Sequence, residues 1–194
     1  MVKLPLDISW SDLRGELIQK LVPGEAEEEE LIRLRGKLER ELTQSLEAER
    51  LKAVAEVHGS AARDTWIAGD RDIDLFIILD GEYSRKILPE VLDVVKAYVK
   101  TGWVEAYAEH PYIKAMIDGY DVDFVPCFRV DPKRGLKSAT DRTPLHTTYV
   151  LLHFKEDARD DVKLLKRFMK GVGVYGADLK VGGFSGYLCE LLVI

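Results

Sequence analysis

The chain has 194 residues, of which 46% are hydrophobic and 32% are charged, and its formal net charge is −6. These values are typical of a globular protein with a substantial core, and the negative charge argues against binding nucleic acid through overall charge, although local basic patches remain compatible with it. No apolar run approaches the roughly 20 residues of a membrane helix, and no signal-peptide layout is present, so we expect a cytoplasmic protein without membrane association.

Two helices are predicted before the first strand. The first is opened by an N-cap cluster at Ser9 and ends near Leu21. The second runs from Glu25 to about Ala53, because leucines recur in it at helical spacing, namely Leu31, Leu34, Leu38, Leu42 and Leu46. We interpret this long amphipathic helix as scaffold, with its acidic residues on a solvated face.

The next stretch predicts a strand, a tight turn at Gly59 and Ser60, a short helix and a second strand. The strands are Val54–His58 and Asp72–Leu79, and the helix between them is Ala61–Ile67. A glycine-serine turn at a helix N-terminus offers backbone N–H groups, a hydroxyl and a positive dipole to an anion such as phosphate. Asp72 and Asp74 lie two residues apart on a strand and therefore share a face. Carboxylates beside a phosphate site suggest bound magnesium.

Further elements complete the predicted sheet. They are an amphipathic helix from Ile87 to Val99 and three strands at Val104–Ala108, Tyr112–Ile117 and Asp121–Phe128. Asp121 and Asp123 share one face of the last strand, so one of them could join Asp72 and Asp74 in a cluster. Residues 133–142 then predict a loop that leaves the sheet.

The C-terminal part is predicted to be helical. Helices are expected from Thr143, which precedes a proline, from Asp157 to Lys170, and after a cap at Ser185. The last residues are apolar and lack a C-cap or polar tail. We therefore expect that the chain has been cut at Ile194.

Three aspartates on adjacent strands would repel one another unless a cation lay between them. Two magnesium ions would satisfy such a site, because one lowers the pKa of an attacking hydroxyl while the other neutralises charge on a departing pyrophosphate. The alternative for Asp72 and Asp74 alone is a solvated strand face. The preceding Gly59-Ser60 turn and the later Asp123 favour the catalytic interpretation.

Four other side chains have two interpretations each. Arg63 could reach a phosphate or form a surface ion pair, and Lys166 could face a triphosphate or be a solvated lysine. Tyr175 could contact a ribose or pack at a turn, and His146 could contact phosphate or sugar. The two cysteines, Cys127 and Cys189, match no zinc spacing and are interpreted as buried thiols.

Seven blocks of sequence occur in a characteristic order: GSAARDTW (59–66), DIDLF (72–76), AEHPY (108–112), DVDFVPC (121–127), DRTP (141–144), VYGA (174–177) and GFSGYLCEL (183–191). Together they closely resemble the archaeal-type, class I, CCA-adding tRNA nucleotidyltransferases of the polymerase-beta-like superfamily. The resemblance extends from about Glu25 to the end of the chain. It implies an α+β fold with a mixed sheet flanked by helices, followed by the start of a helical central domain.

The resemblance also implies an activity and a site. Such an enzyme adds C, C and A to the 3′ end of tRNA from CTP and ATP without a nucleic-acid template, and the intact protein could be a homodimer. By motif, the catalytic residues and ligands of two Mg²⁺ ions would be Asp72, Asp74 and Asp123. The nucleotide would be bound by Gly59, Ser60, Arg63, Thr143, His146, Lys166 and Tyr175. Residues 1–142 would form the catalytic head domain, and residues 143–194 would begin a truncated central domain that binds nucleotide and tRNA.

Two departures from the family pattern are expected to matter. The first metal position is commonly Glu in the family, whereas this chain has Asp72, which shortens the arm but keeps the charge. Family members also continue well beyond this length, into the part that reads the incoming base. The open alternatives are another enzyme of the superfamily, such as a poly(A) polymerase, an oligoadenylate synthetase or a small-molecule nucleotidyltransferase, and a non-catalytic fragment that binds RNA or protein.

Overall fold

The computed structural model describes residues 9–131, 135–155, 158–177 and 180–194. Its centre is a five-stranded sheet with the order β1-β2-β5-β4-β3. The strands are β1 (Ala53–His58), β2 (Asp72–Leu79), β3 (Trp103–Tyr107), β4 (Pro111–Ile117) and β5 (Tyr120–Phe128). Strands β2 and β5 run parallel, whereas the other neighbouring strands are antiparallel. The predicted α+β fold with a mixed sheet is therefore confirmed.

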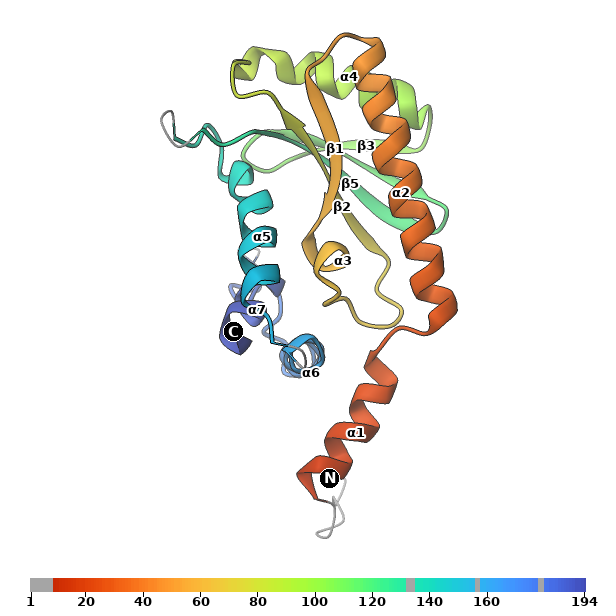
Figure 1. The fold of residues 1–194 in the computed structure, drawn as a ribbon, viewed down its shortest axis with the longest axis vertical. Coiled ribbons are helices and arrows are strands. Elements are labelled where there is room, and N and C mark those ends of the chain that lie inside the picture. The colour runs from red at the N-terminus through yellow and green to blue at the C-terminus, as the bar shows by residue number, and fades with distance from the viewer. Residues whose placement is uncertain (1–8, 132–134, 156–157, 178–179) are drawn as a thin grey trace.

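One face of the sheet is covered by the long helix α2 (Glu25–Ala48) and by α4 (Leu88–Val99), as Figure 1 shows. The helical leucine repeat is buried on this face: Leu31, Leu34, Leu38, Leu42 and Leu46. They pack into one core with the alternate residues of the central strands, including Ile73, Leu75, Ile77, Val122 and Phe124. Because each fully buried leucine contributes roughly 1.5–3 kcal/mol by leaving water, this layer is the main support of the sheet.

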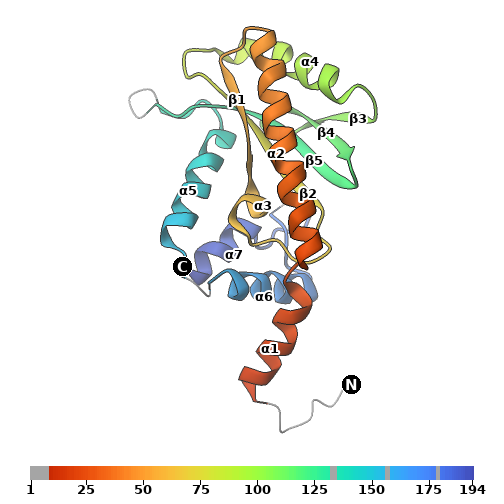
Figure 2. The same cartoon turned by 45° about the vertical axis from the view of Figure 1, so that its right-hand side comes forward.

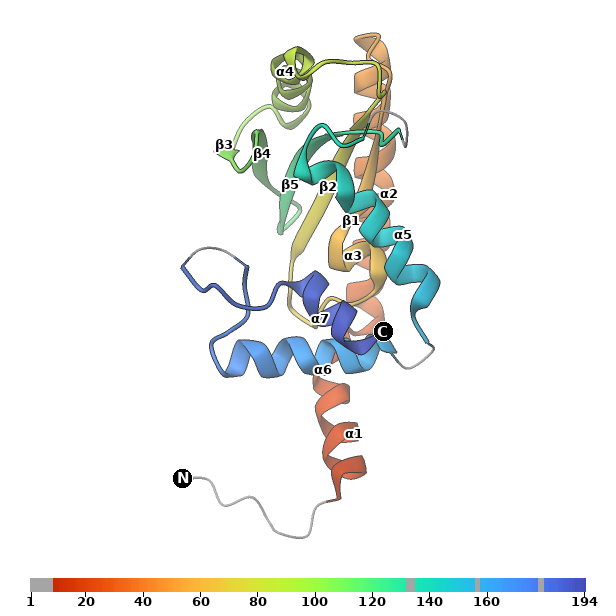
Figure 3. The same cartoon turned by 90° about the vertical axis from the view of Figure 1, so that its left-hand side faces the viewer.

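The opposite face of the sheet carries the acidic residues of β2 and β5 and a small apolar cluster of Phe76, Ile78 and Cys127. The C-terminal helices α5 (Thr143–His153), α6 (Ala158–Gly171) and α7 (Gly186–Val193) follow β5 in the chain. Figures 2 and 3 show α6 and α7 beyond the end of the sheet at which β1 meets α3 (Gly59–Arg63). The helical part thus faces the turn between β1 and α3.

Several predicted boundaries are wrong. Helix α2 ends at Ala48 rather than near Ala53, because the chain turns at Arg50, whose φ is 59°. Helix α3 spans Gly59–Arg63 rather than Ala61–Ile67, because Asp64 adopts the left-handed conformation with a φ of 55°. Ends of strands differ from the predictions by single residues.

The segment predicted as a loop, residues 133–142, is only partly irregular. Residues 133 and 134 lie outside the described residues, while Ala139–Arg142 forms a 3₁₀ turn with a capping box between Ser138 and Asp141. Buried Asp141 also accepts a hydrogen bond from the N–H of Phe128 at 2.8 Å. The turn therefore fixes the start of α5 against the end of β5. Residue 157, the predicted start of α6, is likewise outside the described residues.

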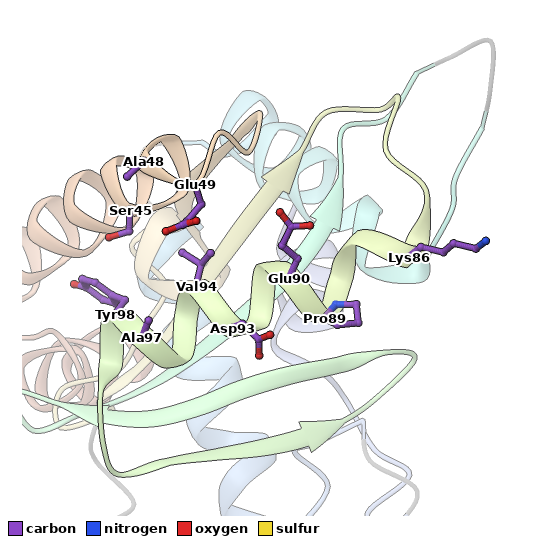
Figure 4. A pocket seen from close by; sticks show the side chains of 10 residues that line it. All are labelled: Ser45, Ala48, Glu49, Lys86, Pro89, Glu90, Asp93, Val94, Ala97 and Tyr98. Carbon is purple, nitrogen blue, oxygen red and sulfur yellow. The ribbon is translucent and has the colours of Figure 1, made fainter.

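A groove of about 690 Å³ lies between the end of α2 and helix α4. Figure 4 shows Glu49 and Glu90 extending into the space between these helices, and Asp93 belongs to the same lining. This acidic groove shares no lining residue with the predicted catalytic site. Across the described residues, we find no helix with the length and apolar character needed to cross a bilayer.

Candidate active site

The turn between β1 and α3 brings Gly59 against Asp74. Gly59 has a φ of +66°, and a Cβ atom there would lie 1.9 Å from Oδ2 of Asp74. Glycine is needed for both the backbone conformation and the space. The β1–β2 register, which pairs His58 with Asp74, creates this close approach. The predicted turn and the predicted carboxylate are thus parts of one site.

The parallel pairing of β2 with β5 sets the carboxylates side by side. Asp72 is opposite Asp121, and Asp74 is opposite Asp123. Burial raises the pKa of Asp72, and the adjacent carboxylates Asp70 and Asp121 raise it further. Burial, followed by the charge of Asp123, also raises the pKa of Asp74. The ionised forms of these groups are therefore destabilised, which a bound cation would relieve.

A lysine that sequence reasoning missed lies beside the third aspartate. Lys114 of β4 is opposite Asp123 in the antiparallel register, and its Nζ atom is 3.0 Å from Oδ1 of Asp123. Burial raises the pKa of Asp123, and this lysine opposes the rise. The sequence did contain a sign that Lys114 could have a role, because it is the only charged residue in this strand, between Ile113 and Ala115.

The acidic face fits magnesium in chemistry. Within the described ranges, no group of three or more His, Cys, Asp or Glu side chains is arranged to hold a metal ion. The donors that Asp72, Asp74 and Asp123 offer are nevertheless hard oxygen atoms, which Mg²⁺ prefers, and burial disfavours their charge. The two-metal arrangement stays a prediction.

A cleft of about 320 Å³ lies between the sheet and the C-terminal helices. All seven residues predicted to bind nucleotide line it, together with Asp74: Gly59, Ser60, Arg63, Thr143, His146, Lys166 and Tyr175. Asp72 and Asp123 are not among its lining residues. Sequence reasoning missed Phe76, Gly186 and Tyr187, which also line the cleft. Tyr187 stacks on His146 with ring centroids 4.1 Å apart, and its position in the GFSGYLCEL block was the available signal.

Helices α3, α6 and α7 form the helical wall of the cleft, which contains two buried cations, Arg63 of α3 and Lys166 of α6. The side chain of Arg63 donates from Nη1 to Oγ1 of Thr147 at 3.1 Å, and the residue is 5% exposed. Lys166, which is 2% exposed, donates from Nζ to the carbonyl oxygen and the hydroxyl of Thr65 at 2.9 and 3.0 Å. Burial lowers the pKa of Lys166 to about 8. The alternatives of a surface ion pair for Arg63 and a solvated lysine are therefore wrong.

Burial also shifts the pKa values of His146 and Tyr175 in the cleft, in each case away from the charged form. Burial, followed by the charges of Arg142 and Arg63, lowers the pKa of His146. Burial raises the pKa of Tyr175 to about 12. Both side chains can therefore exchange hydrogen bonds with a sugar or phosphate without carrying charge themselves.

Comparison with known protein families identifies both parts of the chain. The family described as nucleotidyltransferase domain matches residues 25–146. This chain belongs to the nucleotidyltransferase family. The family described as tRNA nucleotidyltransferase, second domain, matches residues 160–194 of this nucleotidyltransferase.

The relatives of this nucleotidyltransferase include CCA-adding enzymes from archaea. The CCA-adding enzyme of Pyrobaculum aerophilum is 41% identical over 189 residues, which cover 94% of this chain and 44% of that protein. The CCA-adding enzyme of Halobacterium salinarum is 52% identical over 136 residues, covering 70% and 30% of the two chains. The resemblance stated from the sequence is confirmed. This nucleotidyltransferase spans less than half the length of these relatives.

Solved structures with the same fold are more distant in sequence. A structure of E. coli MS115-1 CdnC with ATP has a TM-score of 0.66 at 18% identity, covering 95% of this chain and 64% of that one. The Cid1 poly(U) polymerase gives a TM-score of 0.66 at 16% identity, with coverage of 94% and 53%. These structures confirm the predicted fold of the nucleotidyltransferase.

Proposed function

We propose that this nucleotidyltransferase is the N-terminal catalytic part of an enzyme that adds CCA to the 3′ end of tRNA from CTP and ATP, with Mg²⁺ and without a template. The observation that carries the proposal is the cleft, which is lined together by a carboxylate, a glycine-serine turn and two buried cations. The similarity to CCA-adding enzymes supports the choice of substrate.

The reaction joins the 3′ oxygen of tRNA to the α-phosphorus of the nucleotide and releases pyrophosphate. Asp72, Asp74 and Asp123 would hold the Mg²⁺ ions. When bound, Mg²⁺ lowers the pKa of the attacking hydroxyl and offsets charge on the pyrophosphate. The carboxylates would supply the negative charge that binds the ions.

The helical wall would bind the nucleotide. The cations Arg63 and Lys166 offset the charge of the triphosphate, and the hydroxyl of Ser60 can donate a hydrogen bond to it. Tyr175 and the neutral His146 contact the ribose, and Thr143 lies beside them at the start of α5. In this account residues 1–142 form the catalytic domain, and residues 143–194 begin the central domain that also binds tRNA.

The experiment is a nucleotide incorporation assay with the full-length protein, Mg²⁺ and a tRNA that lacks its CCA end. We expect CMP to be incorporated twice and AMP once, with no incorporation of GMP or UMP. Repeated addition of a single nucleotide, or addition to any RNA regardless of its fold, would favour a different nucleotidyltransferase of the superfamily. No incorporation of any nucleotide would contradict a catalytic function.

A further inference from the structure

Glu190 of α7 is a carboxylate that the proposed chemistry does not use. It is 0% exposed, although glutamate side chains are almost never fully buried unless they are paired. Its Oε2 atom lies 2.8 Å from Nε of Arg63, and its Oε1 atom lies 3.7 Å from Nζ of Lys166. Burying a carboxylate costs several kcal/mol unless nearby cations and hydrogen bonds compensate. The two cations of the cleft, Arg63 and Lys166, therefore compensate for the burial of this carboxylate.

The contacts of Glu190 join segments that are far apart in the sequence. The hydroxyl of Thr65, just after α3, donates to Oε1 of Glu190 at 2.5 Å. Lys166 comes from α6, which packs against α7 in Figure 3, while Arg63 comes from α3. One side chain thus connects the turn that follows β1 with both helices on the other side of the cleft.

The contact with Arg63 acts mainly through charge. Within the described residues, neither Nε of Arg63 nor Oε2 of Glu190 makes a hydrogen bond of good geometry, although the two atoms are close. The Nη1 atom of Arg63 is fixed separately by Thr147. Glu190 and Thr147 hold two edges of the guanidinium, while the residue still lines the cleft. The guanidinium is thereby oriented before a ligand arrives.

The charges of the cluster do not cancel. Arg63 and Lys166 contribute two positive charges, and Glu190 contributes one negative charge, so one positive charge remains beside the cleft. A triphosphate would compensate for it. Without Glu190, the two buried cations would face each other with no charge between them, and each would be expected to move or, for lysine, to lose its proton.

We infer that Glu190 is a positioning residue, which holds Arg63 and Lys166 in the orientation that binds the triphosphate and thereby couples α7 to the catalytic turn. The inference rests on the proposed function, because it assumes that a nucleoside triphosphate occupies this cleft. Glu190 itself touches no substrate; it acts through the two cations.

A dependence on pH follows from the surroundings of Lys166. Burial lowers the pKa of this lysine most, Arg63 of α3 lowers it further, and Glu190 and Cys189 of α7 and Asp70 before β2 raise it. On its own helix, Lys170 is paired with Asp70, and Lys163 with Asp64 and Asp160. Removing the charge of Glu190 should lower the pKa of Lys166 further, so that this lysine loses its proton at a lower pH. Phosphate binding should therefore weaken more at pH 8 than at pH 6.5.

The test measures binding of CTP and of cytidine to the full-length protein and to Glu190→Gln, which keeps the size of the side chain. We expect the Kd for CTP at pH 8 to rise at least about tenfold, with a smaller rise at pH 6.5, while the Kd for cytidine changes less than twofold. Unchanged CTP binding would show that Glu190 does not position the cations, and tighter CTP binding would show that it only repels phosphate. Equal weakening of both ligands would indicate general distortion. Either result would overturn the inference.

Two further variants keep the test decisive. Asp161→Asn is the matched control, since it breaks an ion pair between α1 (Trp10–Leu21) and α6, with Nη2 of Arg14 at 2.8 Å, outside the cleft; we expect no change for either ligand. If Glu190→Gln does not fold, Glu190→Asp retracts the charge instead, and retained CTP affinity in it would overturn the inference.

Wild-type protein that binds no CTP would contradict the proposed function itself, whereas normal wild-type binding with an unaffected variant contradicts only the role of Glu190.

Discussion

The two walls of the cleft carry opposite charges and balance them differently. On the sheet wall, burial and the charge of the neighbouring Asp123 raise the pKa of Asp74, the carboxylate that lines the cleft, so its negative charge is poorly compensated by the chain itself. On the helical wall, Glu190 already lies between the two buried cations. The difference indicates that the helical wall is organised before the proposed nucleotide binds, while the proposed Mg²⁺ would complete the sheet wall.

The sheet wall is tested most strongly by Asp74→Asn. The substitution keeps the shape of the side chain but removes a charge that would hold Mg²⁺, so we expect the kcat of nucleotide addition to fall at least about a thousandfold. The control is Asp93→Asn in the acidic groove between α2 and α4, which should leave the rate unchanged. Full activity of Asp74→Asn would contradict the assignment of the metal site.

The junction between the two walls is tested by Gly59→Ala. An added Cβ would collide with Oδ2 of Asp74 and require a positive φ, so we expect a loss of activity of about a hundredfold and destabilisation of at least about 1 kcal/mol. Gly69→Ala provides the matched control. Gly69 has a φ of +83° but nothing within 4 Å of the added atom, so stability should fall while activity remains. Activity losses of equal size in the two variants would contradict a specific role for the approach of Gly59 to Asp74.

The helical wall is tested by the pH dependence of nucleotide binding. The pKa of Lys166, about 8, lies below its ordinary value of 10.5, so the folded protein loses this proton first. The contribution of Lys166 to stability therefore rises as pH increases from about 8 to 10.5, whereas its positive charge for phosphate disappears. We expect the KM for CTP to rise about tenfold above pH 8. The rise should vanish in Lys166→Arg, which does not titrate there, and an identical profile in both proteins would contradict it.

The smallest expected effect concerns Lys114, which partly neutralises the sheet wall. Removing its ammonium group in Lys114→Met leaves Asp123 without a paired cation. Because Mg²⁺ then no longer competes with this lysine, we expect the Mg²⁺ concentration for half-maximal activity to fall about threefold. An increased Mg²⁺ requirement would instead show that Lys114 supports the bound metal or substrate.

The sequence allowed the sheet wall to be predicted better than the helical wall. Alternation was enough to place Asp72 with Asp74 on one face of a strand, and Asp121 with Asp123 on one face of another, because the period of a strand is short and regular; the family resemblance then selected Asp123. The left-handed conformation of Asp64, which ends α3, has no comparable periodic signal. Lys114 was missed because its partner is set by the register between β4 and β5, which is a tertiary property.

The helical wall was harder to predict, because its residues are held by tertiary contacts that no local sequence pattern reveals. Lys166 and Arg63 were named as nucleotide-binding residues through a family resemblance, while local reasoning left solvated alternatives open. Their burial follows from the packing of α6 and α7 near α3, which brings Glu190 within reach of both side chains. Glu190 belongs to the GFSGYLCEL block, but the sequence analysis assigned it no role, because an isolated Glu in a short helix gives no sign of being buried.

The central claim is that a nucleoside triphosphate and Mg²⁺ together occupy the space between the two walls. The most direct measurement is a crystal structure of the full-length protein with CTP and Mg²⁺. The account expects the phosphates to contact Ser60, Arg63 and Lys166, with metal ions at Asp72, Asp74 and Asp123. A triphosphate bound elsewhere, or metal ions that do not touch these three carboxylates, would contradict it.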